Sequence, residues 1–128
     1  MSYYFSKVVN DKFETAVSNV TEQLKLEGFG VLTEIDVQQI LKNKLGVDFG
    51  KYKILGACNP DFAYQALLAE SCIGTMLPCN IIIREDENGK VQVAAVDPVA
   101  SMAAIKNKSL EKIAHKVREK LKKTILWV

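Results

Sequence analysis

Hydrophobic and polar positions along the chain follow two periods, and each change of period marks a new predicted element. Apolar residues at every second position, or short runs rich in β-branched and aromatic residues, are typical of strands. Apolar residues three or four positions apart are typical of helices. The first pattern predicts strands at residues 3–9, 29–35, 51–58, 79–85 and 91–97. The second predicts helices between Asp11 and Gly28, between Asp36 and Gly46, at about 60–70 and from Ser109 onward.

Polar residues and glycines at the ends of the helices support these boundaries. Asn10 or Asp11 is expected to cap the first helix and Asp36 the second, because an Asn or Asp side chain accepts a hydrogen bond from an unpaired backbone N–H. Gly28 and Gly46 are natural stops, since glycine enters the left-handed conformation without steric cost. The apolar residues of the first helix share one face and are Phe13, Ala16, Val17, Val20 and Leu24.

The pattern also makes three predictions about packing. The helix at 60–70 is apolar nearly all round, so we expect it to be buried on more than one side. The segment 97–105 is expected to be irregular. The strand at 29–35 is expected to place four residues on one side of the sheet: Phe29, Val31, Thr33 and Ile35.

The order of the elements, β-α-β-α-β-α-β-β-α, indicates the fold class. The last two strands are joined by a short turn that contains Asn88-Gly89, and this pair is a strong signal for a two-stranded hairpin. Hairpin strands are antiparallel, so a purely parallel sheet is excluded. The sequence therefore predicts an α+β protein, one domain over residues 1–128, with a mixed or mainly antiparallel sheet and helices packed against it.

Composition and the N-terminal segment indicate where in the cell the protein is expected. The chain has 128 residues, of which 48% are hydrophobic and 25% charged, with a formal net charge of +2. These values are ordinary for a soluble protein, and no apolar run approaches the length needed to span a membrane. The N-terminal segment lacks the basic and apolar regions of a secretion signal. Because three cysteines make an odd count without a dense framework, we expect free thiols and a cytoplasmic location.

Two of the cysteines lie in similar motifs, GACNP at 56–60 and LPCN at 77–80. Most of the first motif has a structural explanation, since Asn59 is a preferred helix cap and Pro60 suits the first helical position. Gly56 is expected where another group passes close to its strand. Cys58 is left unexplained: it is either a small buried residue or a thiol near a helix N-terminus.

The remaining chemistry-bearing residues do not form a recognisable catalytic or metal motif. The sequence contains no C-x-x-C pair, and its one histidine, His115, falls on the polar face of the last helix. Structural zinc requires four ligands, commonly in close pairs, and a dithiol motif requires C-x-x-C. We therefore expect no metal and no cofactor, and we assign no catalytic residue; whether the protein is an enzyme stays open.

In their order and spacing, these motifs resemble the domain-of-unknown-function 302 family. The resemblance rests on GFGVLTEIDVQ at 28–38, GACNP followed by Ala63, Tyr64 and Leu67, IGxxLPCN at 73–80, the glycine hairpin and Asp97-Pro98. It covers nearly the whole chain. The resemblance implies a compact α+β homodimer with a layer of helices on a curved sheet, and it carries over no catalytic residue.

Three hypotheses about function follow. The first is a non-catalytic homodimer that binds a small ligand or a protein partner. It is motivated by the uncharged segment 71–78 near GACNP and by the wide apolar surface of the helix between them, since such surfaces form pockets or subunit interfaces. Its candidate ligand-binding residues are Gly56, Cys58, Asn59, Tyr64, Cys79 and Asn80. The second is a thiol-based redox sensor or enzyme that uses Cys58 and Cys79.

The third hypothesis is nucleic-acid binding by the C-terminal helix. Residues 106–123 contain eight Lys or Arg residues and two acidic residues. These cations lie on the polar face of an amphipathic helix, and no aromatic residue is interleaved to stack on bases. A solvated helix face is therefore the preferred interpretation, and we expect neither nucleic-acid binding nor membrane contact.

Overall fold

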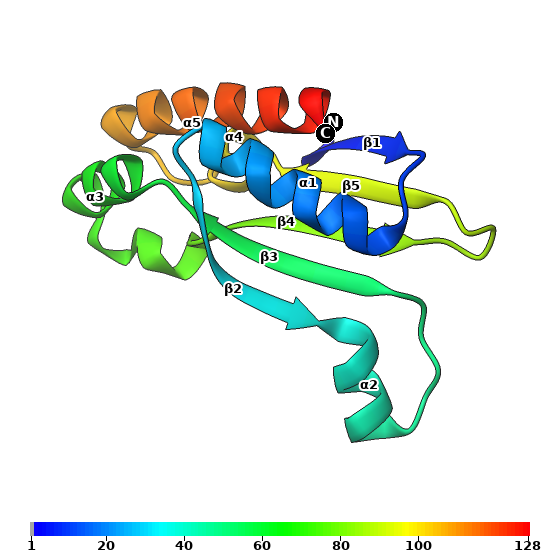
Figure 1. Ribbon diagram of the computed structural model, residues 1–128. Coiled ribbons are helices and arrows are strands. Elements are labelled where there is room, and N and C mark those ends of the chain that lie inside the picture. The colour runs from blue at the N-terminus through cyan, green and yellow to red at the C-terminus, as the bar shows by residue number, and fades with distance from the viewer. Residues whose placement is uncertain (1) are drawn as a thin grey trace.

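The computed structural model describes residues 2–128 and contains one five-stranded sheet. The strands lie in the order β1-β5-β4-β3-β2, and every neighbouring pair is antiparallel. Figure 1 shows this sheet as a curved layer. The strands are β1 (Tyr4–Val9), β2 (Gly30–Asp36), β3 (Tyr52–Cys58), β4 (Cys79–Glu85) and β5 (Val91–Val96). The predicted α+β class and element order are confirmed.

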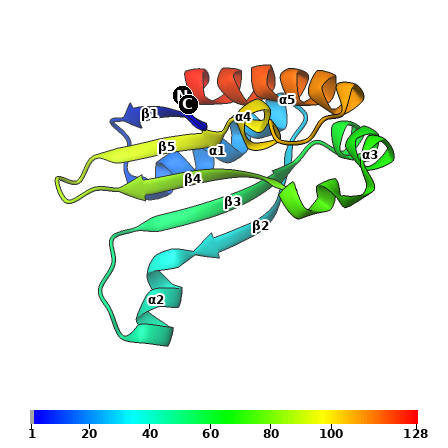
Figure 2. The same cartoon turned by 180° about the vertical axis from the view of Figure 1, so that it is seen from behind.

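Helices cover only one face of the sheet. In Figures 1 and 2, α1 and α5 lie across that face, α3 lies at one end of the molecule, and α2 projects from the sheet beyond β2 and β3. The helices are α1 (Phe13–Leu26), α2 (Val37–Leu45), α3 (Pro60–Ala69), α4 (Pro98–Ser101) and α5 (Lys108–Trp127), with the 3₁₀ helix η1 (Ser71–Met76) after α3. We call the uncovered side of the sheet the open face.

The core lies between the sheet and the pair α1 and α5. Alternate residues of the central strands point into it, because successive side chains of a strand point to opposite sides. Leu55, Ile81, Ile83 and Val93 are fully buried there. Each such side chain stabilises the fold by about 1.5–3 kcal/mol through burial alone. The helices contribute Ala16, Val20, Leu24, Val117, Leu121 and Ile125.

Helix ends follow the expected rules with one exception. The Asp36 side chain accepts a hydrogen bond from Gln39 N at the start of α2, and Gly46 ends that helix at φ 66°. Gly28 follows α1 at φ 84°. The predicted cap of α1 by Asn10 or Asp11 is wrong, because Lys12 occupies the cap position and its side chain makes no capping hydrogen bond. Burial of Phe13 at the first helical position sets where this helix begins.

The register of β2 corrects a second prediction. The pairing with β3 shifts between Val31 and Thr33, so that Leu32 is an extra residue opposite no partner. Such a bulge interrupts the alternation of side chains between the two faces. Val31 consequently packs against the core, whereas Thr33 pairs with Gly56, a position of the open face. The expected single row of Phe29, Val31, Thr33 and Ile35 is therefore wrong.

The third helix is much less buried than predicted. Of the residues of α3, only Ala66 is buried, and Tyr64 and Leu68 are 65% and 70% exposed. The reason is its position at the end of the molecule, where it contacts α5 and η1 on one side and has no second layer outside it. The segment expected to be irregular contains the short helix α4, whose N-terminus is capped by Asp97.

The open face of β3 is closely covered at Gly56. A Cβ atom built there would lie 2.7 Å from Cγ of Pro78 and even closer to Oγ1 of Thr33. Both neighbours belong to adjacent segments of the sheet, so the strand requires glycine at this point. By contrast, a Cβ atom at Gly30 of β2 would meet no atom within 4 Å.

We predict that Gly56→Ala lowers the free energy of unfolding by about 1–3 kcal/mol, because the added methyl group forces Thr33 or Pro78 to move. Urea denaturation followed by circular dichroism measures this change. Gly30→Ala is the matched strand control, and its effect should stay within about 1 kcal/mol. Equal stability of the Gly56→Ala variant and the wild type would contradict the proposed close contact.

Candidate functional site

A cavity of about 230 Å³ lies at the end of the sheet where β3 leaves it and β4 enters it. Its walls come from the sheet rim, from α3 and from the first half of α5, which Figure 2 shows side by side at this end of the molecule. We call it the rim cavity. Its lining includes Phe29, Leu32, Phe62, Ala63, Ala66, Leu77, Pro78, Met102, Leu110, Ile113, Ala114 and Val117, together with Cys58, Asn59 and Cys79.

The two cysteine motifs meet at this cavity because β3 and β4 are neighbouring antiparallel strands. Ala57 pairs with Cys79 in their register, which places Cys58 one position from that pair. Cys58, Asn59 and Cys79 all contribute to the cavity wall. The sequence could not show this convergence, since the two motifs are separated by α3 and η1.

The other three candidate residues lie elsewhere. Gly56 and Asn80 pair with each other in the same register but belong to the open face. Tyr64 is on the outer side of α3 and is 65% exposed. The alternation of side chains along a strand separates Asn80 from Cys79, and Gly56 has no side chain that could reach the cavity. Three of the six candidate residues, Cys58, Asn59 and Cys79, therefore line the rim cavity. A role of these residues in ligand binding stays a prediction.

Asn59 holds two connecting segments in place at the mouth of the site. Its side-chain oxygen accepts a hydrogen bond from Phe62 N at 3.4 Å, as expected for the cap of α3. Its side-chain nitrogen donates to the carbonyl of Glu27, also at 3.4 Å, which ties α3 to the end of α1. Both polar atoms of the amide are thus engaged within the chain, and the residue positions the wall that carries Phe62.

The two thiols differ in exposure. Cys79 is buried and Cys58 is partly exposed. Burial, with a smaller contribution from nearby Cys58, raises the pKa of the Cys79 thiol from 9.0 to about 11. The folded thiol keeps its proton to a higher pH than the unfolded one. The contribution of this protonated thiol to the free energy of unfolding is therefore fully present below pH 9, and it is lost as the pH rises to about 11.

Several wall residues were absent from the sequence prediction. Met102 and Leu110 come from the C-terminal part of the chain, and Ala66 comes from the inner side of α3. The apolar stripe of α5 was visible in the sequence, but the same pattern describes an ordinary core-facing helix. Only the packing of α5 against α3 makes part of that stripe a cavity wall.

The chemistry available at the rim cavity is that of an apolar binding site. Aliphatic, aromatic and sulfur-bearing side chains dominate its wall, and no charged residue lines it. Within residues 2–128, no cluster of three or more His, Cys, Asp or Glu side chains could hold a metal ion. His115 is exposed on α5 and is not part of the cavity wall.

Three basic residues of α5 form ion pairs within the chain. Arg118 forms an ion pair with the buried carboxylate of Asp97 at 3.2 Å, and Lys120 and Lys123 approach Glu27 at 3.9 and 3.6 Å. Arg118 also lies over the ring of Phe5. These contacts agree with the interpretation of this surface as a solvated helix face. No helix in the described part of the chain, residues 2–128, is long and apolar enough to cross a membrane.

Comparison with known proteins places the chain in a family. No curated protein sequence matches it. One similar solved structure is that of an uncharacterized conserved DUF302 protein from Bacillus stearothermophilus, which is 27% identical in sequence. The match covers 98% of this chain and 97% of the Bacillus chain, and the two structures superpose with a TM-score of 0.91. The family model described as "Domain of unknown function DUF302" matches residues 5–126. The chain therefore belongs to the DUF302 family.

Proposed function

We propose that this protein is a non-catalytic homodimer whose protomers each bind a small, uncharged, largely apolar ligand in the rim cavity. The observation that carries the proposal is the wall of that cavity, in which apolar side chains from α3, α5 and the sheet rim line a concave space beside Cys58 and Cys79. A wall of this kind favours a small molecule over a protein partner, because the space is concave and lies between packed elements.

The size of the cavity limits the ligand. Apolar cavities of about 150 Å³ stay dry and bind molecules as large as benzene. The rim cavity has a volume of about 230 Å³, which suits a molecule of one or two rings or a short branched chain. Asn59 is the polar side chain of the wall, but both ends of its amide are engaged. Affinity would therefore come mainly from burial of apolar surface.

The thiol-based alternative has less support. A reactive cysteine requires an accessible thiol of low pKa, because the thiolate is the nucleophile. Cys79 is buried and its pKa is raised to about 11. Cys58 is more exposed, and it is the residue that would have to carry any such chemistry. Nucleic-acid binding through α5 is also less favoured, since Arg118, Lys120 and Lys123 already pair with carboxylates.

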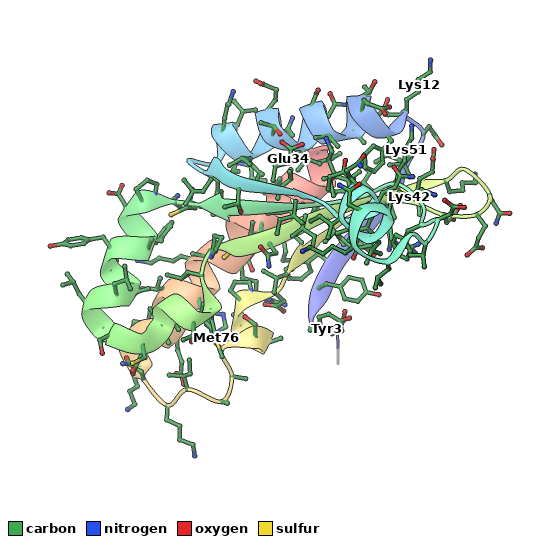
Figure 3. The ribbon with its side chains drawn as sticks, turned by 90° about the horizontal axis from the view of Figure 1, so that it is seen from below. Tyr3, Lys12, Glu34, Lys42, Lys51 and Met76 are labelled. Atoms are coloured by element: carbon green, nitrogen blue, oxygen red, sulfur yellow. The ribbon has the colours of Figure 1, made fainter. Side chains whose placement is uncertain are left out.

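The homodimer part of the proposal is supported by α2. Figure 3 views the molecule from below, toward the open face, with α2 directed at the viewer and away from the sheet. No residue of α2 is buried within the protomer. Its side chains Ile40 and Leu45, and Phe49 in the following loop, are 40%, 68% and 46% exposed. An apolar helix face of this kind is expected to contact a second copy of the chain.

We predict that a neutral two-ring probe, indole, raises the melting temperature of the wild-type protein by about 2–5 °C when it is in about tenfold excess over its dissociation constant. Ala66→Met should abolish this rise, because Ala66 is buried at the cavity wall and the longer side chain fills the space. Differential scanning fluorimetry measures both effects.

Gln65→Met is the matched control for this experiment, since Gln65 is an exposed neighbour on the same helix. Its response to indole should equal that of the wild type. Native mass spectrometry of freshly purified protein adds an independent test, because a retained ligand appears as excess mass over the denatured chain. The proposal fails if indole shifts neither protein and the native mass shows no adduct.

We predict that the double variant Ile40→Asp, Leu45→Asp is monomeric, because two charges on the apolar face of α2 would have to be buried in the dimer. The wild type should give twice the 14.2 kDa protomer mass in a native mass spectrum and the variant the single mass. Gln39→Asp, on the opposite side of α2, should remain dimeric. A monomeric wild type, or a variant that stays dimeric, would contradict this interface.

We predict that iodoacetamide modifies Cys72 at least about a hundredfold faster than Cys79 in the native protein at pH 8. Cys72 is exposed, whereas burial shields Cys79 and raises its pKa from 9.0 to about 11, which lowers the thiolate fraction of Cys79 by about that factor. Peptide mapping by mass spectrometry measures each rate, and denatured protein provides the control in which the rates converge. Rapid labelling of native Cys79 would instead favour the thiol-based alternative.

A further inference from the structure

The open face carries a second concave surface, unrelated to the rim cavity. Its side chains form rows that run across the sheet, because registered partners on neighbouring antiparallel strands point to the same side. The middle row is apolar except for Ser6 and consists of Ser6, Ala94, Ile82, Ile54 and Ile35. The row toward the β4–β5 hairpin is Val8, Gln92, Arg84 and Tyr52.

Ile82 and Ala94 of the middle row and Gln92, Arg84 and Tyr52 of the other row line a groove of about 430 Å³, which we call the sheet groove. Arg84 and Tyr52 lie at one end, Ile82 and Ala94 form the floor, and Asn80 lies toward the other end. Tyr3 and Tyr4 close that second end, with their rings 4.9 Å apart in an edge-to-face arrangement, and Figure 3 shows Tyr3 there. Arg84 and Asn80 are four residues apart on β4, so the groove is about 14 Å long.

Arg84 is the one charged residue among those that line the groove. Its Nε donates a hydrogen bond of 2.7 Å to the Gln92 side chain, its registered neighbour on β5. This bond orients the guanidinium and leaves its two terminal nitrogens for another acceptor. Among residues 2–128, no carboxylate forms an ion pair with Arg84, although its surroundings are partly buried.

The terminal nitrogens of Arg84 are therefore available to an anion that enters the groove. The planar fork of a guanidinium matches a carboxylate, which accepts two parallel hydrogen bonds from its terminal nitrogens. The apolar floor of Ile82 and Ala94 extends from that fork along the sheet. An apolar chain attached to a carboxylate would therefore satisfy the charge and cover the floor at once.

We propose that the sheet groove binds an elongated monocarboxylic acid of small size. Its carboxylate accepts hydrogen bonds from the terminal nitrogens of Arg84, and its apolar body lies on Ile82 and Ala94. Tyr52 flanks the carboxylate, and Asn80 meets the far end of the molecule. The site is distinct from the rim cavity, whose lining contains no charge and which is proposed to take an uncharged ligand.

Octanoate and its uncharged analogue octanamide are probes that separate the two parts of this recognition. Isothermal titration calorimetry on the full-length protein should show octanoate binding at least about tenfold more tightly than octanamide, since a charge-assisted bidentate contact contributes at least that factor. The affinity for octanoate should fall as salt is added. In a ¹⁵N-resolved NMR titration, octanoate should shift the Nε–H resonance of Arg84.

Arg84→Met tests the residue directly, because methionine keeps an apolar side chain and removes the guanidinium. We expect this variant to bind octanoate about tenfold more weakly than the wild type. Lys90→Met in the exposed hairpin removes the same charge away from the groove and should leave the affinity unchanged. Ala66→Met, which fills the rim cavity, should leave it unchanged as well, and this result separates the two sites.

Three results would overturn the proposal. They are failure of octanoate to bind at millimolar concentration, equal affinities for octanoate and octanamide, and an Arg84→Met variant with wild-type affinity. If the variant with wild-type affinity also loses the dimer in a native mass spectrum, the groove is assigned to contact between protomers.

Discussion

The antiparallel pairing of β3 with β4 is the interaction on which both binding surfaces depend. It brings together two segments that α3 and η1 separate along the chain, and its register sets which residues share a face. Ala57 and Cys79 face the helices, whereas Gly56 and Asn80 face the open side. A shift of one residue would exchange these sets, because side chains alternate along a strand. The close approach of Thr33 and Pro78 to Gly56 leaves little freedom for such a shift.

The one-sided covering of the sheet explains why the molecule has two unlike concave surfaces. On the covered side, α3 reaches beyond the end of the sheet and α5 lies behind it, so apolar side chains surround the rim cavity. On the open side, the sheet groove is lined by strand residues and by Tyr3, which directly precedes β1. The apolar walls of the first are the basis for proposing an uncharged ligand there, and the guanidinium of Arg84 is the basis for proposing an anion in the second.

Some of the charge on the helical side is paired within the chain. Asp97 illustrates the pattern, since one carboxylate oxygen accepts from Val99 N to cap α4 and the other accepts from Arg118. Arg118 in turn lies over the ring of Phe5 on β1, so α4, α5 and the edge of the sheet are linked through one side chain. The cationic surface of α5 is therefore in part a scaffold, and its composition by itself does not indicate a nucleic-acid site.

Local signals in the sequence were sufficient for the element order, the hairpin, the caps at Asp36 and Asn59 and the stops at Gly28 and Gly46. Each depends on a residue and its near neighbours, and family membership follows from the same motifs. The unbroken row of β2, the burial of α3 and the cap of α1 at Asn10 or Asp11 were predicted wrongly. The structure instead has a bulge at Leu32, an exposed α3 and a first helix that begins at Phe13, because packing between distant segments decides these features.

The site shows the same division between local and tertiary determinants. The sequence by itself singled out Cys58, Asn59 and Cys79, since their motifs stand out along the chain. Only the tertiary structure placed them in one wall with Ala66, Met102 and Leu110, and separated them from Gly56, Tyr64 and Asn80. It alone left Arg84 without an ion-pair partner on the open face. A strand pattern specifies alternation, but the choice of side for each residue belongs to the assembled sheet, where burial and pairing are determined together.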